Sequence, residues 1–376
     1  MLSWHLITGE YPPQPGGVSD YTRLVATRLA RAGDIVNVWA PGPNSCESVD
    51  EGAIVRRLPG RFGLSALRVL DRALHETPGK ILVQYVPHAF GMKAMNFPFV
   101  LWLYARRKMD IAVMYHEVAF PISRSQPLRH NLLGAANRMM AAVAAHAARR
   151  IFVSTVSWEE PLRGLIPKNA RILCLPMPSN IPVVKDADGI AAVRRNFSPA
   201  TDPLVGHFGT FGGAITGLLD KILPRLLDEV PGANAVLIGR NSEQYRTAIA
   251  REYPKLARRI HASGSIPLCE VSMCISACDL LVQPYPDGIT TRRTSAMVGL
   301  AHRRAIITNS GHLTEPIWSE RRAVAMAPAA DVDAGVALAR DFLGDTARRE
   351  HLARSGAKLY ADSFDISHTI ASLRAA

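Results

Sequence analysis

Short apolar segments alternate with helical patterns along nearly the whole chain, and this alternation constrains the fold more than any other feature. Residues 2–8 form a predicted buried strand, residues 18–32 a predicted helix, and Gly33 is placed to end that helix. Repeated strand-helix-strand units predict a parallel sheet covered by helices. The pattern continues with predicted strands at 35–39, 81–87, 111–118 and 151–155 and predicted helices at 96–108 and up to residue 150.

The alternation stops between residues 176 and 203 and then resumes with predicted strands beginning at 204, 234, 259, 279 and 304. A chain of 376 residues is also longer than one hydrophobic core usually serves. We therefore expect an α/β protein with two Rossmann-like, doubly wound parallel-sheet domains facing a cleft. The expected boundaries are 1–182 for the first domain, 183–358 for the second, and 359–376 for a C-terminal helix that packs back on the first.

The composition is that of a soluble globular enzyme, with 48% hydrophobic and 20% charged residues. We expect a cytoplasmic protein, because neither a signal peptide nor a run of about 18 apolar residues is present. The net charge of +12 and the pI near 9.8 indicate an anionic partner, which could be nucleic acid, acidic lipid or a phosphate-bearing substrate. Nucleic acid is not expected, since no binding motif for it is present and aromatic residues make up only 7%.

Five cysteines in a long chain argue against a disulfide scaffold. Cys269, Cys274 and Cys278 lie near His261, but their spacing matches no established metal-binding pattern. We expect these cysteines to be structural, and we expect no metal.

The strand-to-helix loops are the places to search for a site, because ligands of such folds bind beyond the carboxyl ends of the strands. Gly16 and Gly17 follow the first strand and would let backbone N–H groups approach an anionic or sugar ligand at a helix N-terminus. A flexible turn is the alternative. Another loop places His116 and Glu117 directly after a strand, where the histidine is either catalytic or merely packed.

Two loops of the second half carry stronger signals. The segment 205–217 is rich in glycine, including Gly209 and Gly212, and suits a nest of backbone donors around a diphosphate, although it is not a P-loop. The segment 282–312 contains an Asp287-Gly288 turn, and from residue 290 it is predicted to enter a helix. Arg292 and Arg293 would then lie in the first turns, where a bound phosphate would offset the unfavourable helix dipole. A solvated helix face is the alternative for both arginines.

These motifs resemble the retaining GT-B glycosyltransferases of family four, which use nucleotide sugars and include bacterial enzymes of polysaccharide and glycoconjugate synthesis. The resemblance covers nearly the whole chain and is carried by the following segments: Gly16-Gly17, "YHE" at 115–117, "LPMPSNI" with Asn180, the glycine-rich turn at 206–213, and "ACDLLVQPYPDG". It implies a hexosyltransferase without a cofactor or required metal, in which the first domain lies on the acceptor side and the second binds the nucleotide sugar.

The resemblance also implies roles for individual residues. Asp287 aligns with an acid beside the donor sugar, and Ser295 aligns with a glutamate that hydrogen-bonds the ribose, so the chain departs from the motif there. The Arg and Lys that hold the diphosphate in relatives are replaced by His207 and Thr210, which leaves Arg292 and Arg293 as substitutes. The remaining implied residues are His116 as a catalytic residue, Gly16, Gly17, Gly209, Thr210 and Gly212 for the donor, and Glu10, Asp20 and Glu117 on the acceptor side.

The acceptor is either a glycan or a lipid-linked molecule on these grounds. The segment 96–108 joins bulky apolar residues to Arg106, Arg107 and Lys108, which suits peripheral contact with the inner face of an anionic membrane. A buried crossover helix is the alternative for its apolar part. Two alternatives to the transferase remain open, a catalytically inactive GT-B protein that binds a nucleotide sugar or partner, and a GT-B sugar-nucleotide epimerase.

Overall fold

The computed structural model of the protein describes residues 1–166, 168–199 and 202–375. The chain forms two compact units. Unit 1 comprises Met1–Met177 together with the segment from Ile366 onward, and unit 2 comprises Pro178–Asp365. The chain thus leaves unit 1 a few residues before position 182 and returns to it a few residues after position 359, the two boundaries expected from the sequence. Ala200 and Thr201, which belong to the expected connection, lie outside the described residues.

Unit 1 is built on an eight-stranded sheet in the order β3-β4-β2-β1-β5-β6-β7-β8. All neighbouring strands are parallel except β3 and β4. These two form a hairpin whose central residues, Glu51 and Gly52, both have positive φ, as a tight two-residue turn requires. The strands are β1 Ser3–Thr8, β2 Ile35–Pro41, β3 Cys46–Asp50, β4 Ala53–Leu58, β5 Lys80–Tyr85, β6 Ile111–Tyr115, β7 Arg150–Val153 and β8 Ile172–Cys174.

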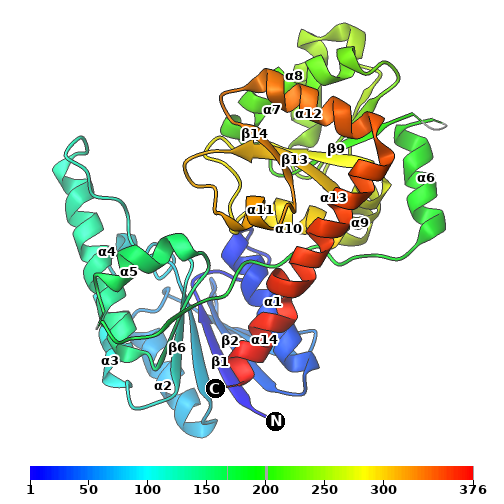
Figure 1. Ribbon diagram of the computed structural model, residues 1–376. Coiled ribbons are helices and arrows are strands. Elements are labelled where there is room, and N and C mark those ends of the chain that lie inside the picture. The colour runs from blue at the N-terminus through cyan, green and yellow to red at the C-terminus, as the bar shows by residue number, and fades with distance from the viewer. Residues whose placement is uncertain (167, 200–201, 376) are drawn as a thin grey trace. The chain divides into compact units, whose positions relative to one another are not determined.

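Helices cover both faces of the sheet in unit 1. The helices α1 and α14 bury residues such as Val25 and Leu373 against one face, whereas α2, α3, α4 and α5 bury their apolar sides on the other. Figure 1 shows α14, in red, lying along α1, in blue. The bounds are α1 Gly17–Arg31, α2 Leu64–Glu76, α3 Phe97–Ala105, α4 Leu128–Ala147, α5 Glu159–Arg163 and α14 Ile366–Arg374, with short helices at Met92–Ala94 and Val156–Trp158.

A buried aspartate ties α14 to the sheet of unit 1. The Asp34 carboxylate accepts hydrogen bonds from the Leu2 backbone N–H at 3.0 Å and from the Trp4 indole N–H at 3.2 Å. The carboxylate also forms an ion pair with Arg374 of α14, in which the Arg374 Nε and Asp34 Oδ2 atoms are 3.2 Å apart. The C-terminal helix therefore belongs to unit 1 by polar contacts as well as by burial of Ile366 and Leu373.

Unit 2 is built on a six-stranded, wholly parallel sheet in the order β11-β10-β9-β12-β13-β14. Its strands are β9 Leu204–Phe208, β10 Asn234–Ile238, β11 Ile260–Ala262, β12 Leu280–Gln283, β13 Ala305–Ser310 and β14 Ala325–Pro328. Its helices are α6 Ala187–Phe197, α7 Gly213–Glu229, α8 Ser242–Glu252, α9 Leu268–Ala277, α10 Thr294–Ala301, α11 Ile317–Glu320, α12 Val332–Gly344 and α13 Thr346–Leu359. A short 3₁₀ helix spans Pro254–Leu256, and a π-helical segment spans Tyr360–Phe364. The helices α7, α8 and α12 pack on one face, and α9 and α10 pack on the other.

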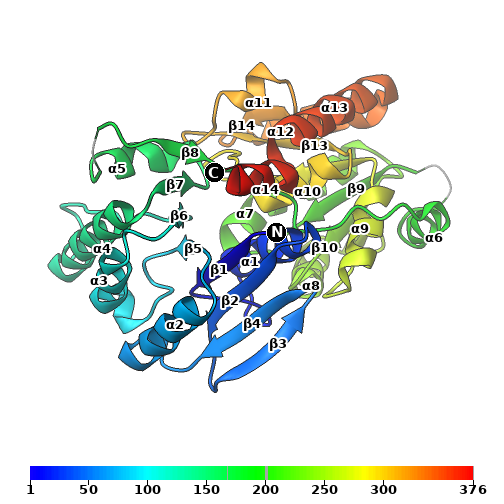
Figure 2. The ribbon, with the colours of Figure 1, turned by 90° about the horizontal axis from the view of Figure 1, so that it is seen from below.

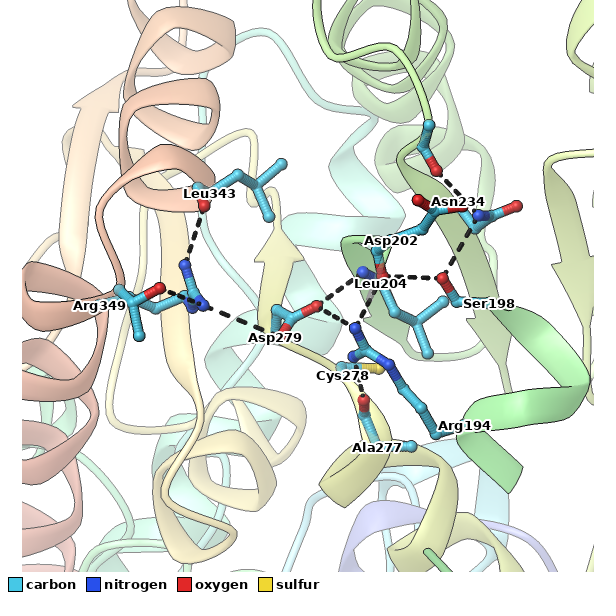
Figure 3. A network of polar contacts seen from close by, with 12 residues as sticks. Arg194, Ser198, Asp202, Leu204, Asn234, Ala277, Cys278, Asp279, Leu343 and Arg349 are labelled. Atoms are coloured by element: carbon cyan, nitrogen blue, oxygen red, sulfur yellow. Dashed lines mark hydrogen bonds and ion pairs between the residues drawn. The ribbon is translucent and has the colours of Figure 1, made fainter. Parts of the chain in front are cut away.

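Asp279 organises the amino ends of the central strands in unit 2 (Figure 3). Its carboxylate accepts a 2.7 Å hydrogen bond from the Leu204 N–H at the start of β9 and pairs with Arg194 of α6 at 2.8 Å. The Arg194 guanidinium also donates to the carbonyls of Ala277 and Asp202. One carboxylate thus joins β9, β12 and α6.

The described residues contain no helix long and apolar enough to cross a membrane. Cys274 and Cys278 are buried, as expected of structural cysteines, whereas this expectation is wrong for Cys269, which is exposed.

Asp279→Ala is expected to lower the free energy of unfolding by about 2 to 3 kcal/mol, because the half-buried Arg194 and the Leu204 N–H lose a charged acceptor. Asp333 provides a matched control, since its ion pair with Arg225 is largely exposed and its replacement by Ala should cost less than about 1 kcal/mol. Urea unfolding of both variants measures the difference. Equal losses would show that the Asp279 network does not stabilise the sheet.

Candidate functional site

Each sheet contains one pair of adjacent parallel strands from which the chain continues in opposite directions, so that two divergent loops lie beside each other. In unit 2 this reversal point falls between β9 and β12, because β9 continues outward to β10 and β12 continues outward to β13. Ligands of open parallel sheets bind beyond the carboxyl ends of the strands at such a point. The two loops there are residues 209–212 and 284–293, which contain most of the donor-binding residues expected from the sequence.

The turn from β9 into α7 carries two glycines, Gly212 and Gly213, at positions that no other residue covers. A Cβ atom built on Gly212 or on Gly213 would have no neighbour within 4 Å, so the first turn of α7 is open. Thr210 is exposed, and its carbonyl accepts a 3.3 Å hydrogen bond from the Asn241 side chain. Gly209 is anchored by a 3.1 Å hydrogen bond to the Ile238 carbonyl. The open N-terminus of a 17-residue helix presents backbone N–H groups that lack partners within the helix.

A buried histidine lies beneath this turn. His207 donates from Nδ1 to the Val282 carbonyl over 2.8 Å, which leaves Nε2 as an acceptor. Nε2 is buried and has no hydrogen-bond partner, and a Cβ atom on Gly209 would lie 3.2 Å from it. Burial lowers the pKa of His207 to about 4, so the imidazole is neutral at neutral pH. Gly209 therefore leaves space beside an unsatisfied imidazole nitrogen.

The loop after β12 is fixed by close backbone packing. Gly288 has a φ of +92°, and a Cβ atom there would lie 2.5 Å from the Gly311 nitrogen. The Asp287 carbonyl accepts a 3.0 Å hydrogen bond from the Leu313 N–H, while the Asp287 side chain is exposed. The residue expected to approach the donor sugar therefore sits on a rigid turn at the carboxyl end of β12.

The prediction that residues 290 onward form a helix with both arginines in its first turns is wrong. The helix α10 begins at Thr294, because residues 290–293 form a turn in which the Thr291 N–H and hydroxyl both donate to Glu315, at 2.7 and 2.6 Å. Arg293 precedes the helix as its N-cap residue, and its guanidinium lies 4.7 Å from the centre of the Tyr285 ring. Arg292 is exposed on the same turn.

Ser295 contacts a tyrosine that the sequence analysis did not single out. The Ser295 Oγ and the Tyr285 hydroxyl are 2.7 Å apart. Burial raises the pKa of Tyr285 to about 12, so this hydroxyl keeps its proton at neutral pH. Two further buried amides at the strand ends, Gln283 and Asn309, have side-chain atoms without hydrogen-bond partners. Sequence offers no motif for them beyond their position at the ends of β12 and β13.

The expected site residues of unit 1 fall into two groups. In the first, Glu10 accepts a 3.0 Å hydrogen bond from the Ser19 N–H and so caps α1. A Cβ atom on Gly16 would lie 2.5 Å from this carboxylate, which explains the glycine there, whereas the corresponding position on Gly17 is open. Asp20 is exposed in the first turn of α1.

The second group surrounds His116, which follows β6 directly. Its Nε2 lies 2.7 Å from the Gln84 Oε1, and its ring meets the Tyr21 ring edge to face with centroids 5.1 Å apart. His116 is 6% exposed, and the Gln84 Nε2 is buried without a partner. The half-buried Glu117 lies 3.8 Å from the Nδ1 atom of His88. Gln84 and His88 were not found from the sequence, because both lie on or after β5, outside any recognisable motif.

No group of three or more metal-ligating side chains occurs among the residues that the structure describes. The polar atoms at the strand ends are instead imidazole, amide and hydroxyl groups, which suit hydrogen bonding to an organic ligand.

Comparison with solved structures identifies the architecture. A sucrose-phosphate synthase from Thermosynechococcus elongatus matches with a TM-score of 0.71 and 16% identity, over 99% of this chain and 97% of that one. WaaG, a glycosyltransferase involved in lipopolysaccharide biosynthesis, matches with a TM-score of 0.65 and 13% identity, over 99% of this chain and 100% of that one. HepE from Anabaena, in complex with UDP and glucose, matches with a TM-score of 0.68 and 12% identity, over 99% and 98%.

These similarities show that the two parallel-sheet units have the fold of GT-B glycosyltransferases, as expected from the sequence. No family model matches the chain, and no curated protein matches it at the sequence level.

The low pKa of His207 predicts a specific dependence of stability on pH. An unfolded histidine titrates near pH 6.5, whereas folded His207 titrates near pH 4, so protons bind preferentially to the unfolded chain between these values. The free energy of unfolding should therefore be highest above pH 6.5 and fall by up to about 3 kcal/mol as the pH drops to 4.

Urea unfolding at several pH values, with the parent and His207→Phe compared, isolates this contribution. The comparison is needed because burial also lowers the pKa values of His5, His261 and His302. The variant should lose less stability than the parent over this range, while the exposed control His312→Phe should behave like the parent. Identical pH profiles for all three proteins would contradict the assignment.

Proposed function

We propose that the protein is a retaining glycosyltransferase that moves a hexose from a nucleotide-sugar donor to a glycan or lipid-linked acceptor. The observation that carries the proposal is the point of reversal in unit 2, where an open, glycine-lined helix N-terminus lies over a buried and unsatisfied imidazole. The similarity of the whole fold to solved glycosyltransferases supports it, including a structure in complex with UDP and glucose.

The nucleoside diphosphate is proposed to bind unit 2. The exposed N–H groups at the start of α7, near Gly212, favour the negatively charged diphosphate through both hydrogen bonding and the helix dipole. Arg292 and Arg293 supply the positive charge that the glycine-rich turn itself does not carry. Ser295 is proposed to contact the ribose, with the Tyr285 hydroxyl orienting its Oγ.

The sugar is proposed to lie beside Asp287, on the rigid turn after β12. Transfer with retention passes through an oxocarbenium-like state, so stabilisation of the departing diphosphate is the main requirement on the protein. In front-face displacement the bond from the anomeric carbon to the diphosphate oxygen breaks, the bond to the acceptor oxygen forms on the same face, and the diphosphate takes the acceptor's proton. His116 is proposed to position the sugar or phosphate, held in place by Gln84. We propose that the reaction proceeds without a metal.

Bacterial polysaccharide or glycoconjugate synthesis is the proposed setting. The inactive GT-B protein would bind a nucleotide sugar without consuming it, and the epimerase would convert it to an isomeric nucleotide sugar without acceptor. The fold similarities to sucrose-phosphate synthase and WaaG favour transfer over both.

Purified protein should be stabilised by one class among UDP-, GDP-, ADP- and dTDP-sugars, because a ligand that binds only the folded state raises the unfolding temperature. A thermal-shift screen measures this, and slow release of the nucleoside diphosphate from the stabilising sugar nucleotide then indicates transfer to water. Failure of all four classes to bind would overturn the proposed function.

Replacing both Arg292 and Arg293 by Ala should weaken binding of the selected nucleoside diphosphate at least tenfold, since charge-assisted hydrogen bonds contribute about 1.5 to 3 kcal/mol each. Binding of the bare nucleoside should change little. Calorimetry measures both, with the exposed pair Arg251→Ala and Arg258→Ala as a control of equal charge. Equal losses for diphosphate and nucleoside would remove the arginines from the site but leave the proposed function standing.

Asp287→Ala should abolish release of the sugar while leaving the unfolding temperature within a few degrees of the parent, because the side chain is exposed. Asp188→Ala, at an exposed position of α6, is the control. An Asp287 variant with parental turnover would show that this carboxylate is not part of the reaction.

A further inference from the structure

The helix α4 of unit 1 has an exposed apolar face. Leu128, Leu132 and Met139 are 75%, 63% and 56% exposed and recur at helical spacing, with the small, exposed Ala135 between them. The opposite side of the helix is the one that packs on the unit, where Met140, Ala141 and Ala144 are fully buried. A helix with apolar residues on both sides can bury only one side in its own core, so the other side calls for a second apolar partner.

The neighbouring elements extend this face. The helices α3 and α4 pack side by side at the edge of unit 1, as Figure 2 shows. Leu101 and Tyr104 of α3 are 56% and 40% exposed. The loop that precedes α4 exposes Phe120 and Ile122, and this loop is fixed to α4 because Arg138 donates to the Phe120 carbonyl at 2.9 Å. We define these seven exposed side chains as the α3–α4 face: Leu101, Tyr104, Phe120, Ile122, Leu128, Leu132 and Met139.

The charged residues of the segment that forms the α3–α4 face are almost all positive. Residues 93–149 contain eight lysines and arginines and only two acids, Asp110 and Glu117. The Asp110 carboxylate pairs with Arg150 at 3.0 Å, and Glu117 lies beside His88. The helix α4 contains no acid. Six of the cations are exposed: Lys93, Arg107, Lys108, Arg124, Arg129 and Arg149.

This combination selects one kind of partner. Apolar side chains accompanied by exposed cations match the acyl and headgroup layers of an anionic bilayer, since the cations are attracted to the anionic headgroups. A second copy of the chain fits less well, because self-association through the face would bring the cations of two molecules together. An uncharged protein partner would leave the cations without a counterpart.

We infer that the α3–α4 face docks on the surface of an anionic membrane, with α4 lying in the plane of the headgroups and its leucines inserted toward the acyl chains. This inference does not depend on the proposed function, because it concerns only the surface of unit 1.

Co-sedimentation of the full chain with vesicles tests the inference. The protein should pellet with vesicles of equimolar phosphatidylglycerol and phosphatidylcholine and remain in solution with phosphatidylcholine alone. The triple variant Leu128→Gln, Leu132→Gln, Met139→Gln should bind the anionic vesicles at least tenfold more weakly, because three side chains no longer leave water. Arg124→Gln with Arg129→Gln should weaken binding about thirtyfold and should reduce the dependence on salt.

Matched controls change the same kinds of residue elsewhere. The triple control is Val49→Gln, Leu64→Gln, Leu268→Gln, at positions 72%, 65% and 45% exposed. The charge control is Arg251→Gln with Arg258→Gln, both exposed on unit 2. Both controls should bind as the parent does, and circular dichroism should show that every variant is folded.

The inference is overturned if the parent fails to bind anionic vesicles, if it binds neutral vesicles equally, or if the controls lose as much affinity as the variants. Sedimentation velocity without lipid covers the remaining case. A dimer that the triple variant dissociates would show that the face is an interface between two copies instead.

Discussion

Both sheets depend on a carboxylate placed at the amino ends of their strands. Asp34 in unit 1 and Asp279 in unit 2 each accept a backbone N–H from the start of the central strand, Leu2 in one case and Leu204 in the other. Each carboxylate also forms an ion pair with an arginine of a helix, and this ion pair offsets the desolvation cost of burying the carboxylate. These contacts fix the strands and covering helices at the amino ends of each sheet. The arrangement at the carboxyl ends therefore depends on the loops there.

At the carboxyl ends the chain uses glycine to bring loops close together. Gly9 leaves no room for a Cβ atom beside Ala89 at the reversal point of unit 1, and Gly288 packs against Gly311 near that of unit 2. Such close packing makes the loops rigid, so the groups on them are held before a ligand arrives. The same ends hold His207 and Gln283, whose buried side chains have unsatisfied atoms. Buried polar atoms without partners lower stability, and their concentration at one end of the sheet is what a binding site would require.

The sequence predicts the fold well because the alternation of strands and helices is visible in short stretches of sequence. Apolar runs located most of the strands, helical spacing located fewer of the helices, and the glycines marked the important loops. The edge strands β3, β8 and β14 were missed, since short edge strands carry few buried residues, and β4 was missed together with its hairpin partner β3.

The site was less predictable, because its geometry depends on contacts between distant residues. Glu315 sets the start of α10 by binding Thr291, which lies 24 positions earlier, and no local signal could have revealed this. Glu10 has a capping role that is visible only once the loop brings it back to Ser19.

The surface of unit 1 shows how local patterns mislead as well as inform. The sequence directed attention to residues 96–108, whose bulky apolar side chains suggested either a membrane contact or a buried helix. In the structure Phe99, Trp102 and Leu103 of that segment are buried, so most of its apolar character belongs to the core. Two leucines of the alanine-rich helix α4 are instead more exposed than any apolar side chain of that segment. The sequence did not single out this helix, because its alanines are explained by close packing against the core. Alanine lets α4 pack closely on the unit, and that close packing leaves Leu128, Leu132 and Met139 on the outer side.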